Sequence, residues 1–197
     1  LMKSEAKTKT ASFDLAFYDR MAAVLNAWKH LGEIPLDKIP PHGMMEEITR
    51  LLYLESRLID QRRLREWLDL FAADGAYWIP ADVDYCDPRR TIAWEFNDRR
   101  RLEERVERLE TGQAYSQIPP TRTVHLLSNI EGMLADDGLL HVLCNFHIPA
   151  QRGQDHQARS GWCGYIFRKE NKRWKIVLKR VNLFDADQPQ SNLSFTL

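Results

Sequence analysis

The spacing of apolar residues along the chain changes from a helical repeat in the first half to a strand-like pattern in the last third. Apolar residues recur every three or four positions over residues 13–31 and again over residues 44–71, which predicts amphipathic helices in both regions. Residues 32–43 carry three prolines and two glycines and are typical of a connector. Asp60 marks a candidate break, so we expect two helices in the second region.

The N-terminal helix has two interpretations. Ser12 or Asp14 can cap its start, and Gly32 can end it. Its apolar stripe suits a helix that packs on its own domain, which we favour, and it also suits an arm that reaches a partner subunit. We therefore expect residues 1–43 to form a tail, a helix and a linker ahead of a single domain over residues 44–197.

Two strands and a third helical region follow. Residues 74–85 read as a strand that Gly75 opens and Pro80 stops, and residues 90–96 read as a second strand.

The helix predicted over residues 97–112 has Asn97 or Asp98 as its N-cap and Gly112 as its terminator. Its Arg and Glu residues lie mostly three or four positions apart, the spacing at which opposite charges pair on a helix surface. This pattern favours a solvated, self-paired face over a nucleic-acid site.

The last third contains four long strand-like segments joined by short turns, which predicts an antiparallel meander. Helices followed by a meander indicate an α+β domain in which the helices cover one face of the sheet. The four segments are residues 122–136, 139–150, 156–169 and 173–184.

Composition narrows the choice of partners. The chain has 28 Lys plus Arg and 28 Asp plus Glu, so its formal net charge is zero and no global field favours nucleic acid or an anionic membrane. The three cysteines, at positions 86, 144 and 163, do not form a disulfide framework. Because no stretch resembles an export signal or a membrane span, we expect a cytoplasmic protein.

The stretch HVLCNFH, residues 141–147, places Cys144 between two histidines and raises the question of a metal site. Its flanks predict a strand, in which alternate side chains point to opposite faces. His141 and His147 would then share one face about 20 Å apart, at roughly 3.3 Å per residue, while Cys144 lies on the other face. This geometry argues against one metal ion and predicts a core face of Val142, Cys144, Phe146 and Ile148.

Motifs for nucleotide binding, serine hydrolysis and zinc proteolysis are absent, and no Cys-x-His pair of the Rieske type occurs. Several residues remain that could perform acid–base chemistry in a pocket. They are His125, His141 and His147 on strands, and Tyr53, Glu55 and Asp60 on a helix.

Three blocks carry a resemblance to a known family. YLESRLIDQRRLREWLDLFAADGAYWIP, DRRRLEERVERLETG and PPTRTVHLLSNIEG occur in this order and closely resemble the β (small) subunit of bacterial aromatic-ring-hydroxylating dioxygenases. The similarity spans roughly residues 44–185 and extends weakly to the end. The most specific parts are Glu55 to Asp60, Glu66-Trp67-Leu68, Arg105, Arg108, Leu109 and Gly112 on the helix, and Arg122, His125, Ser128 and Asn129 on the strand.

The resemblance implies an α+β cone of the NTF2-like (cystatin-like, SnoaL-like) type, in which helices wrap a strongly curved mixed or antiparallel sheet. It also implies a β subunit that binds no metal and assembles with a larger α subunit, commonly as α3β3, and that can also associate with itself as a trimer. The α subunit would carry the Rieske [2Fe–2S] cluster, the mononuclear Fe(II) and the aromatic substrate, with electrons arriving from NADH. Candidate interface residues are Arg105, Arg108, Arg122, His125 and Asn129.

Two departures from the family pattern affect the expected assembly. Where the family often has a Gly-Arg-Arg-acid run, this chain has Gly161, Trp162, Cys163 and Gly164. The helix of residues 13–31 also looks longer than the usual N-terminal arm.

The competing hypothesis is a free-standing enzyme of the same cone fold, such as a dehydratase, isomerase or hydrolase. It would use His125 and Asp60, with Tyr53, in an apolar cavity. The deciding observation is whether His125 and Asp60 face an open cavity or are packed against neighbours.

Overall fold

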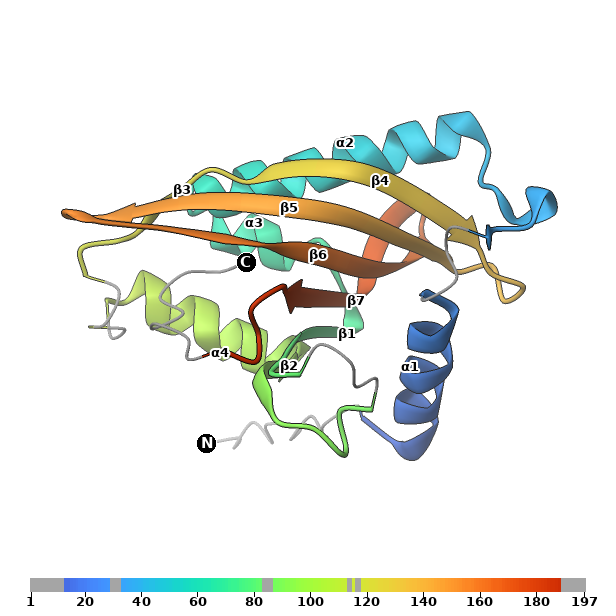
Figure 1. Ribbon diagram of the computed structural model, residues 1–197, viewed down its shortest axis with the longest axis horizontal. Helices are drawn as coiled ribbons and strands as arrows, with labels where there is room; N and C mark the ends of the chain where they lie inside the picture. The colour runs from blue at the N-terminus through green and yellow to red at the C-terminus, as the bar shows by residue number, and fades with distance from the viewer. Residues whose placement is uncertain (1–12, 29–32, 83–86, 113–114, 116–117, 189–197) are drawn as a thin grey trace, which may run out of the picture.

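A computed structural model describes residues 13–28, 33–82, 87–112, 115 and 118–188, and it consists of one curved seven-stranded sheet with helices packed on it (Figure 1). The helices are α1 (Leu15–Trp28), the 3-10 turn η2 (Leu36–Lys38), α2 (His42–Asp60), α3 (Leu64–Leu68) and α4 (Arg99–Glu110). The strands are β1 (Phe71–Pro80), β2 (Ala93–Asp98), β3 (Arg122–Thr123), β4 (Leu126–Leu134), β5 (Leu140–Arg152), β6 (Asp155–Glu170) and β7 (Arg173–Leu183). The predicted α+β class is confirmed.

The sheet is mixed, with the strand order β2-β1-β7-β6-β5-β3 and with β4 also paired to β5. The segment from β4 to β7 is the expected antiparallel meander, because each of these strands pairs antiparallel with the next. The only parallel pairing in the described sheet joins β1 to β7. This pairing brings the helical first half of the chain onto the meander.

Helices α2, α3 and α4 cover one face of the sheet and form the main core with it. Ile48 and Leu52 of α2, Trp67 of α3, and Leu102 and Val106 of α4 are buried in this core. The break predicted at Asp60 is confirmed, because α2 ends there and α3 begins at Leu64.

Helix α1 packs on the opposite face, so the expectation that the helices cover a single face is wrong. Phe17, Met21 and Trp28 of α1 contact Trp78 and Ile166, whereas the neighbouring residues of those strands point into the main core. Alternate side chains of a strand point to opposite faces, so a sheet whose two faces are both apolar needs cover on both sides. Figure 1 shows α1 at one end of the molecule and α4 at the other.

Strand boundaries differ from the prediction at two places. Strand β1 begins at Phe71 and not at Gly75, which lies at a shift of register between β1 and β7. The single strand expected over residues 122–136 is divided into β3 and β4, and β4 contains a second shift of register around Asn129, where φ is +50°. Irregularities of this kind bend a strand, and they add curvature to the sheet.

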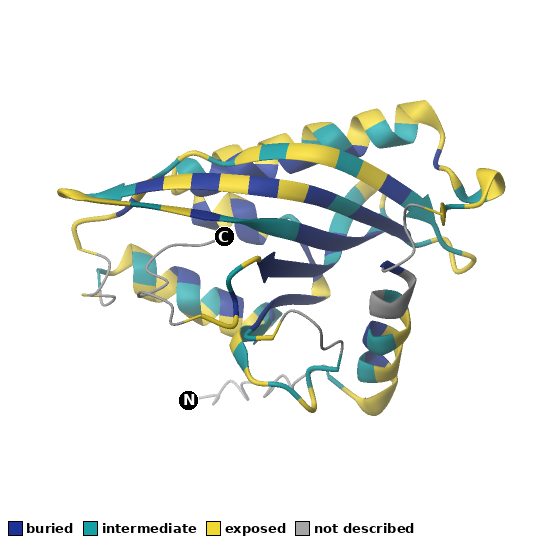
Figure 2. Cartoon of the chain, in the orientation of Figure 1, coloured by how far each residue is buried: buried dark blue, intermediate teal, exposed yellow. Residues whose placement is uncertain are grey.

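The alternation predicted for β5 is confirmed. Val142, Cys144, Phe146 and Ile148 are buried in the main core, while Asn145 and His147 are exposed. Figure 2 shows these stripes of buried and exposed residues along β5, and it shows β7 and β1 buried almost throughout. Strand β5 therefore has one exposed face over residues 145–149, whereas β7 and β1 are covered on both faces over most of their length.

Candidate functional site

The structure brings His125 and Asp60 together, as the hypothesis of a catalytic pair requires. Oδ1 of Asp60 accepts hydrogen bonds from Nδ1 of His125 at 2.6 Å and from the Thr123 hydroxyl at 2.7 Å, and Oδ2 accepts from the backbone N–H of His125 at 3.0 Å. His125 lies in the short link between β3 and β4. The Asp60 carboxylate at the end of α2 thus binds the short link between β3 and β4 to the helix.

The pair is packed against its neighbours and does not face an open cavity. Only 4% of the His125 side chain is exposed, and its Nε2 has no hydrogen-bond partner in the described part of the chain. The cavity beside the ring measures about 10 Å³, which is at or below the volume that one water molecule needs. Tyr53 lies apart on the exposed side of α2 and does not join the pair.

Hydrogen bonding holds Asp60 in its ionised form. Burial by itself raises the pKa of this carboxyl, but the hydrogen bonds from the ring and amide of His125 and from Thr123 outweigh it, so the pKa lies below its usual value. An ionised, fully bonded carboxylate with no room for a substrate is a structural anchor and a poor proton carrier.

A second polar cluster fills the space inside the curve of the sheet. Glu55 accepts hydrogen bonds from the Lys179 ammonium at 2.9 Å, the Tyr165 hydroxyl at 2.8 Å and the Trp67 indole at 3.1 Å. The side chains of Glu55 and Lys179 are 2% and 3% exposed. Lys179 also lies over the rings of Tyr77 and Tyr165, at 5.8 and 5.7 Å from their centroids. Every oxygen of Glu55 therefore has a donor.

The sequence pointed to Glu55 but missed its partners. Lys179 itself could have indicated this cluster. It lies two and four residues before Val181 and Leu183, so its side chain points to the same core face of β7. A lysine at such a position requires a buried anion. Nothing local identifies that anion as Glu55, which lies on a helix 124 residues earlier.

Two cysteines lie directly opposite each other beside this cluster. Cys144 of β5 pairs with Cys163 of β6, and both are buried as free thiols, whereas Cys86 lies outside the described residues. The hydrogen bond with Cys163 and burial raise the pKa of the Cys144 thiol, and burial and Glu55 raise that of the Tyr165 hydroxyl. Within the described ranges, no group of three or more His, Cys, Asp or Glu residues is arranged to hold a metal ion.

The two histidines of HVLCNFH meet different surroundings on the second face of β5. His141 is buried under α1, with the Trp28 ring edge-on at 6.4 Å, and burial lowers its pKa in spite of the charge of Asp137. His147 is exposed and its Nδ1 lies 2.7 Å from the Ser160 hydroxyl.

The segment of residues 161–164 and helix α1, the two expected departures from the family pattern, pack against each other. A Cβ atom at Gly164 would lie 2.4 Å from the Trp28 ring, so only glycine leaves room for α1 at this place. Trp162 packs edge-on against Trp28 at 6.1 Å, and Arg180 lies over the Trp162 ring at 5.5 Å. The uncharged segment of β6, residues 161–164, is thus the surface on which the C-terminal end of α1 packs.

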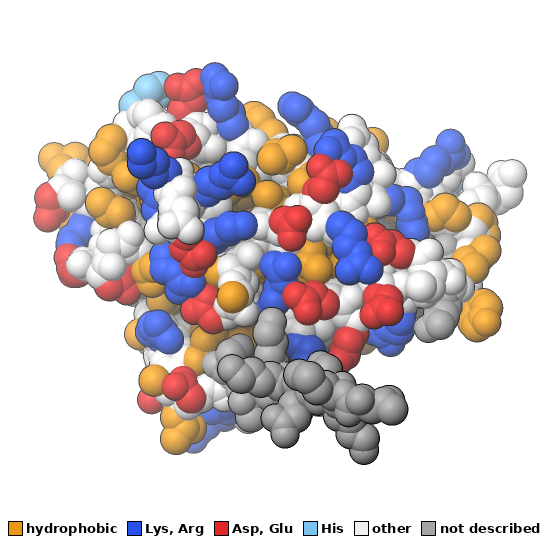
Figure 3. Space-filling model, turned by 180° about the vertical axis from the view of Figure 1, so that it is seen from behind, with side chains coloured by type: hydrophobic (Ala, Val, Ile, Leu, Met, Phe, Trp, Pro, Cys, Tyr) orange, Lys and Arg blue, Asp and Glu red, His pale blue; other side chains and the backbone are white. Residues whose placement is uncertain are grey.

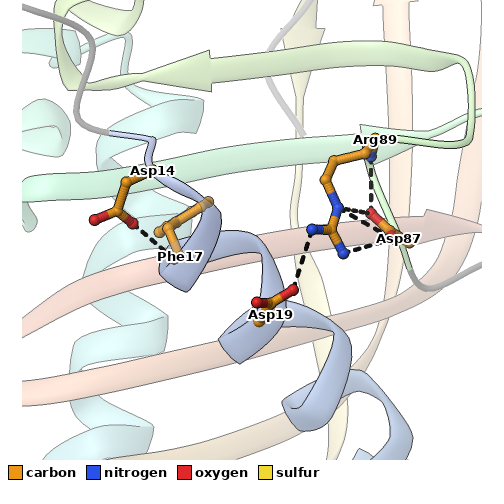
Figure 4. Close-up of polar contacts among 5 residues, drawn as sticks. All are labelled: Asp14, Phe17, Asp19, Asp87 and Arg89. Carbon is orange, nitrogen blue, oxygen red and sulfur yellow. Dashed lines mark hydrogen bonds and ion pairs between the residues drawn. The ribbon is translucent and has the colours of Figure 1, made fainter.

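The other end of α1 is fixed by charged residues (Figure 4). The carboxylate of Asp14 caps the helix by accepting from the backbone N–H of Phe17 at 2.8 Å. Arg89, in the connection between β1 and β2, donates to Asp87 and also to Asp19 of α1 at 3.1 Å. These contacts favour the interpretation that α1 packs on its own domain.

The candidate interface residues occupy different environments. Arg108, Arg122 and Asn129 are exposed, and Arg122 donates to the Gln151 side chain at 3.0 Å. Arg105 is largely buried against Glu95, and the His125 ring is buried as described above. The face in Figure 3 shows Lys and Arg side chains interspersed with Asp and Glu, in agreement with the balanced composition.

No helix among the described residues is long and apolar enough to cross a membrane.

Known proteins share both the sequence and the fold. Residues 54–187 match the family model described as "Ring hydroxylating beta subunit". The β subunit of 3-phenylpropionate/cinnamic acid dioxygenase from Photorhabdus laumondii is 35% identical over 161 residues, which cover 75% of this chain and 88% of that protein. The β subunit of benzoate 1,2-dioxygenase from Acinetobacter baylyi is 31% identical over 144 residues, covering 71% and 85%.

A solved structure of a relative shares the α+β fold of this chain. The crystal structure of the β subunit of benzoate 1,2-dioxygenase from Burkholderia mallei is 29% identical in sequence and superimposes with a TM-score of 0.63. The alignment covers 83% of this chain and 98% of that chain. Helix α1 lies before residue 54, where the match to the family model begins.

Proposed function

The chain belongs to the ring-hydroxylating β-subunit family and is the small, non-catalytic subunit of a multicomponent aromatic-ring-hydroxylating dioxygenase; from this we propose that its role is to hold catalytic α subunits in register. The observation that carries the proposal is the filled interior. In a cone-fold enzyme this space would hold the substrate. Here it holds the Glu55–Lys179 pair with its donors, and the cavity beside His125 measures only about 10 Å³.

In this proposal the iron lies on the partner. The α subunit carries the Rieske [2Fe–2S] cluster and the mononuclear Fe(II), and this chain contributes no ligand to either. The complex is α3β3, in which the β subunits also contact one another as a trimer. Closed symmetry of this kind repeats one set of surface patches around an axis, so a rigid β subunit fixes the spacing of its partners.

The interface residues divide into two roles. Arg108, Arg122 and Asn129 are exposed and contact other subunits directly. His125 and Arg105 act from inside the chain, His125 by fixing the link between β3 and β4 to α2, and Arg105 by fixing α4 to β2 through Glu95. A buried ring that is hydrogen-bonded to an ionised carboxylate suits a positioning role.

The substrate of the complex is an aromatic carboxylic acid in this proposal, because the relatives named above belong to dioxygenases of benzoate and of 3-phenylpropionate or cinnamic acid. We also place the protein in the reducing cytoplasm. Cys144 and Cys163 face each other across the β5–β6 ladder as free thiols, which is the state that such a compartment maintains.

Co-expression with the α-subunit gene expected beside this one tests the proposal. A tag on this chain should retain the α subunit, and the purified complex should have the mass of α3β3, contain iron and oxygenate an aromatic acid. This chain purified alone should contain no stoichiometric iron. Failure of the two chains to co-purify at micromolar concentration, or iron bound to this chain alone, would contradict the proposal.

A further inference from the structure

A hollow of about 480 Å³ lies between the edge strand β2 and helix α4. Trp94, Glu95 and Asn97 of β2 contribute to one wall. Arg101, Arg105 and Arg108 of α4 form the other, and their spacing of four and three positions places them on one helix face. The hollow is large enough for one or two side chains of another protein.

Positive charge in the hollow exceeds negative charge. Three guanidinium groups line it, and Glu95 is the single carboxylate among the lining residues. Glu95 is paired with Arg105, whose side chain is 16% exposed and whose buried Nε has no hydrogen-bond partner in the described part of the chain. The guanidinium of Arg101 donates to the Phe96 carbonyl at 3.3 Å and forms no ion pair with a described residue.

Arg108 also contributes a positive charge that no carboxylate of the described residues balances. It is exposed, and no described residue forms an ion pair with its guanidinium. By contrast, Arg99 and Arg100 of the same helix pair with Glu103 and Glu104. The sequence predicted that the arginines of α4 pair with glutamates of the same helix. Arg99 and Arg100, outside the hollow, form such pairs, whereas the three arginines that line the hollow do not.

An exposed aromatic side chain and the outer edge of the sheet lie at the hollow. Trp94, which lines it, is 42% exposed, and Ile92, next to the lining residue Ala93, is 82% exposed. Strand β2 is the last strand of the described sheet, and among the described strands it pairs only with β1. Exposed aromatic and arginine side chains are typical of interface centres, and an open edge strand offers hydrogen bonds to a second chain.

We propose that this hollow receives acidic side chains of the α subunit, with Arg101 and Arg108 binding the carboxylates and Trp94 covering the adjoining apolar contact. Guanidinium groups bind carboxylates through paired, charge-assisted hydrogen bonds, and the excess of two positive charges selects an acidic occupant. The inference rests on the proposed function, since it names the part of this chain that an α subunit contacts.

The test compares two variants of this chain in the complex with the α subunit. Arg101→Ala/Arg108→Ala removes the unpaired charges and leaves Arg105 and Glu95 in place. Arg100→Ala is the matched control, because Arg100 lies on the same helix, outside the hollow, and pairs with Glu104 at 2.5 Å. Binding of each purified variant to α is measured by biolayer interferometry at low and high salt, with circular dichroism to verify folding.

The double variant should raise the dissociation constant about tenfold or more and weaken its dependence on salt, while the control stays within about twofold of the wild type. Equal affinity and equal salt dependence for all three proteins would overturn the inference and leave the proposed function standing. Failure of the wild type itself to bind α would overturn the proposed function. Sedimentation of this chain alone is the last arm: self-association that the double variant abolishes would assign the hollow to a second copy and overturn the choice of α.

Discussion

The buried Glu55–Lys179 pair should be the most sensitive polar contact of the fold. Replacing either residue alone, by Glu55→Gln or Lys179→Met, leaves one buried ion without its counter-ion. Both side chains are almost fully buried, at 2% and 3% exposure, so water cannot take the place of the missing partner. Breaking such a pair typically costs about 3–5 kcal/mol of unfolding free energy.

For a chain of 197 residues this loss corresponds to a decrease in Tm of about 6–20 °C, at about 2–4 °C per kcal/mol. The double variant Glu55→Gln/Lys179→Met removes both charges and keeps the approximate volume. It should therefore lose less stability than the sum of the single variants, with a coupling of about 1–3 kcal/mol. Urea unfolding monitored by tryptophan fluorescence measures the stability of the wild type, the two single variants and the double variant, which together form a double-mutant cycle.

The matched control is Glu47→Gln, the same substitution on the same helix at an exposed site. Glu47 accepts from Lys169 and Trp174 at the surface, where ion pairs are screened by solvent, and its replacement should change stability little. Two results would refute the reasoning: single core variants no more destabilised than the control, or a double variant whose loss equals the sum of the single losses.

Further predictions concern the packing of α1, the titration of Asp60 and the N-cap of α4. Gly164→Ala should destabilise the chain by about 1–3 kcal/mol and expose α1 to limited proteolysis, because the new methyl group would overlap the Trp28 ring; Gly43→Ala, with no atom within 4 Å of its Cβ position, should do neither. Asp60→Asn should flatten the acid limb of the stability–pH curve. The pKa of Asp60 is lowered on folding, so its contribution is present above the unfolded value near 3.8 and disappears as the pH falls through the folded value; an unchanged acid limb would contradict this. Asp98→Ala removes the acceptor for the Arg101 backbone N–H at 2.8 Å and should cost about 0.5–2 kcal/mol in urea unfolding, and a neutral effect would count against the cap.

Much of the local structure follows from residues close in sequence. The period of apolar residues predicted the helices and the meander, and Asp98 and Gly112 marked the ends of α4, where the capping hydrogen bond and a φ of +71° confirm them. Strand alternation placed Cys144 on the core face. These features depend on neighbours within a few positions, so a pattern in the chain is enough to specify them.

Other features depend on which distant segments meet. The sequence by itself determined the fold class, the order of the elements, the faces of β5 and the membership of the β-subunit family. Only the tertiary structure decided that α1 covers the second face above Gly164, that Glu55 meets Lys179, that Asp60 fastens His125, and that three arginines of α4 share a hollow with one carboxylate. The physical reason is that these contacts are set by sheet register and curvature, which bring together side chains that no local pattern relates.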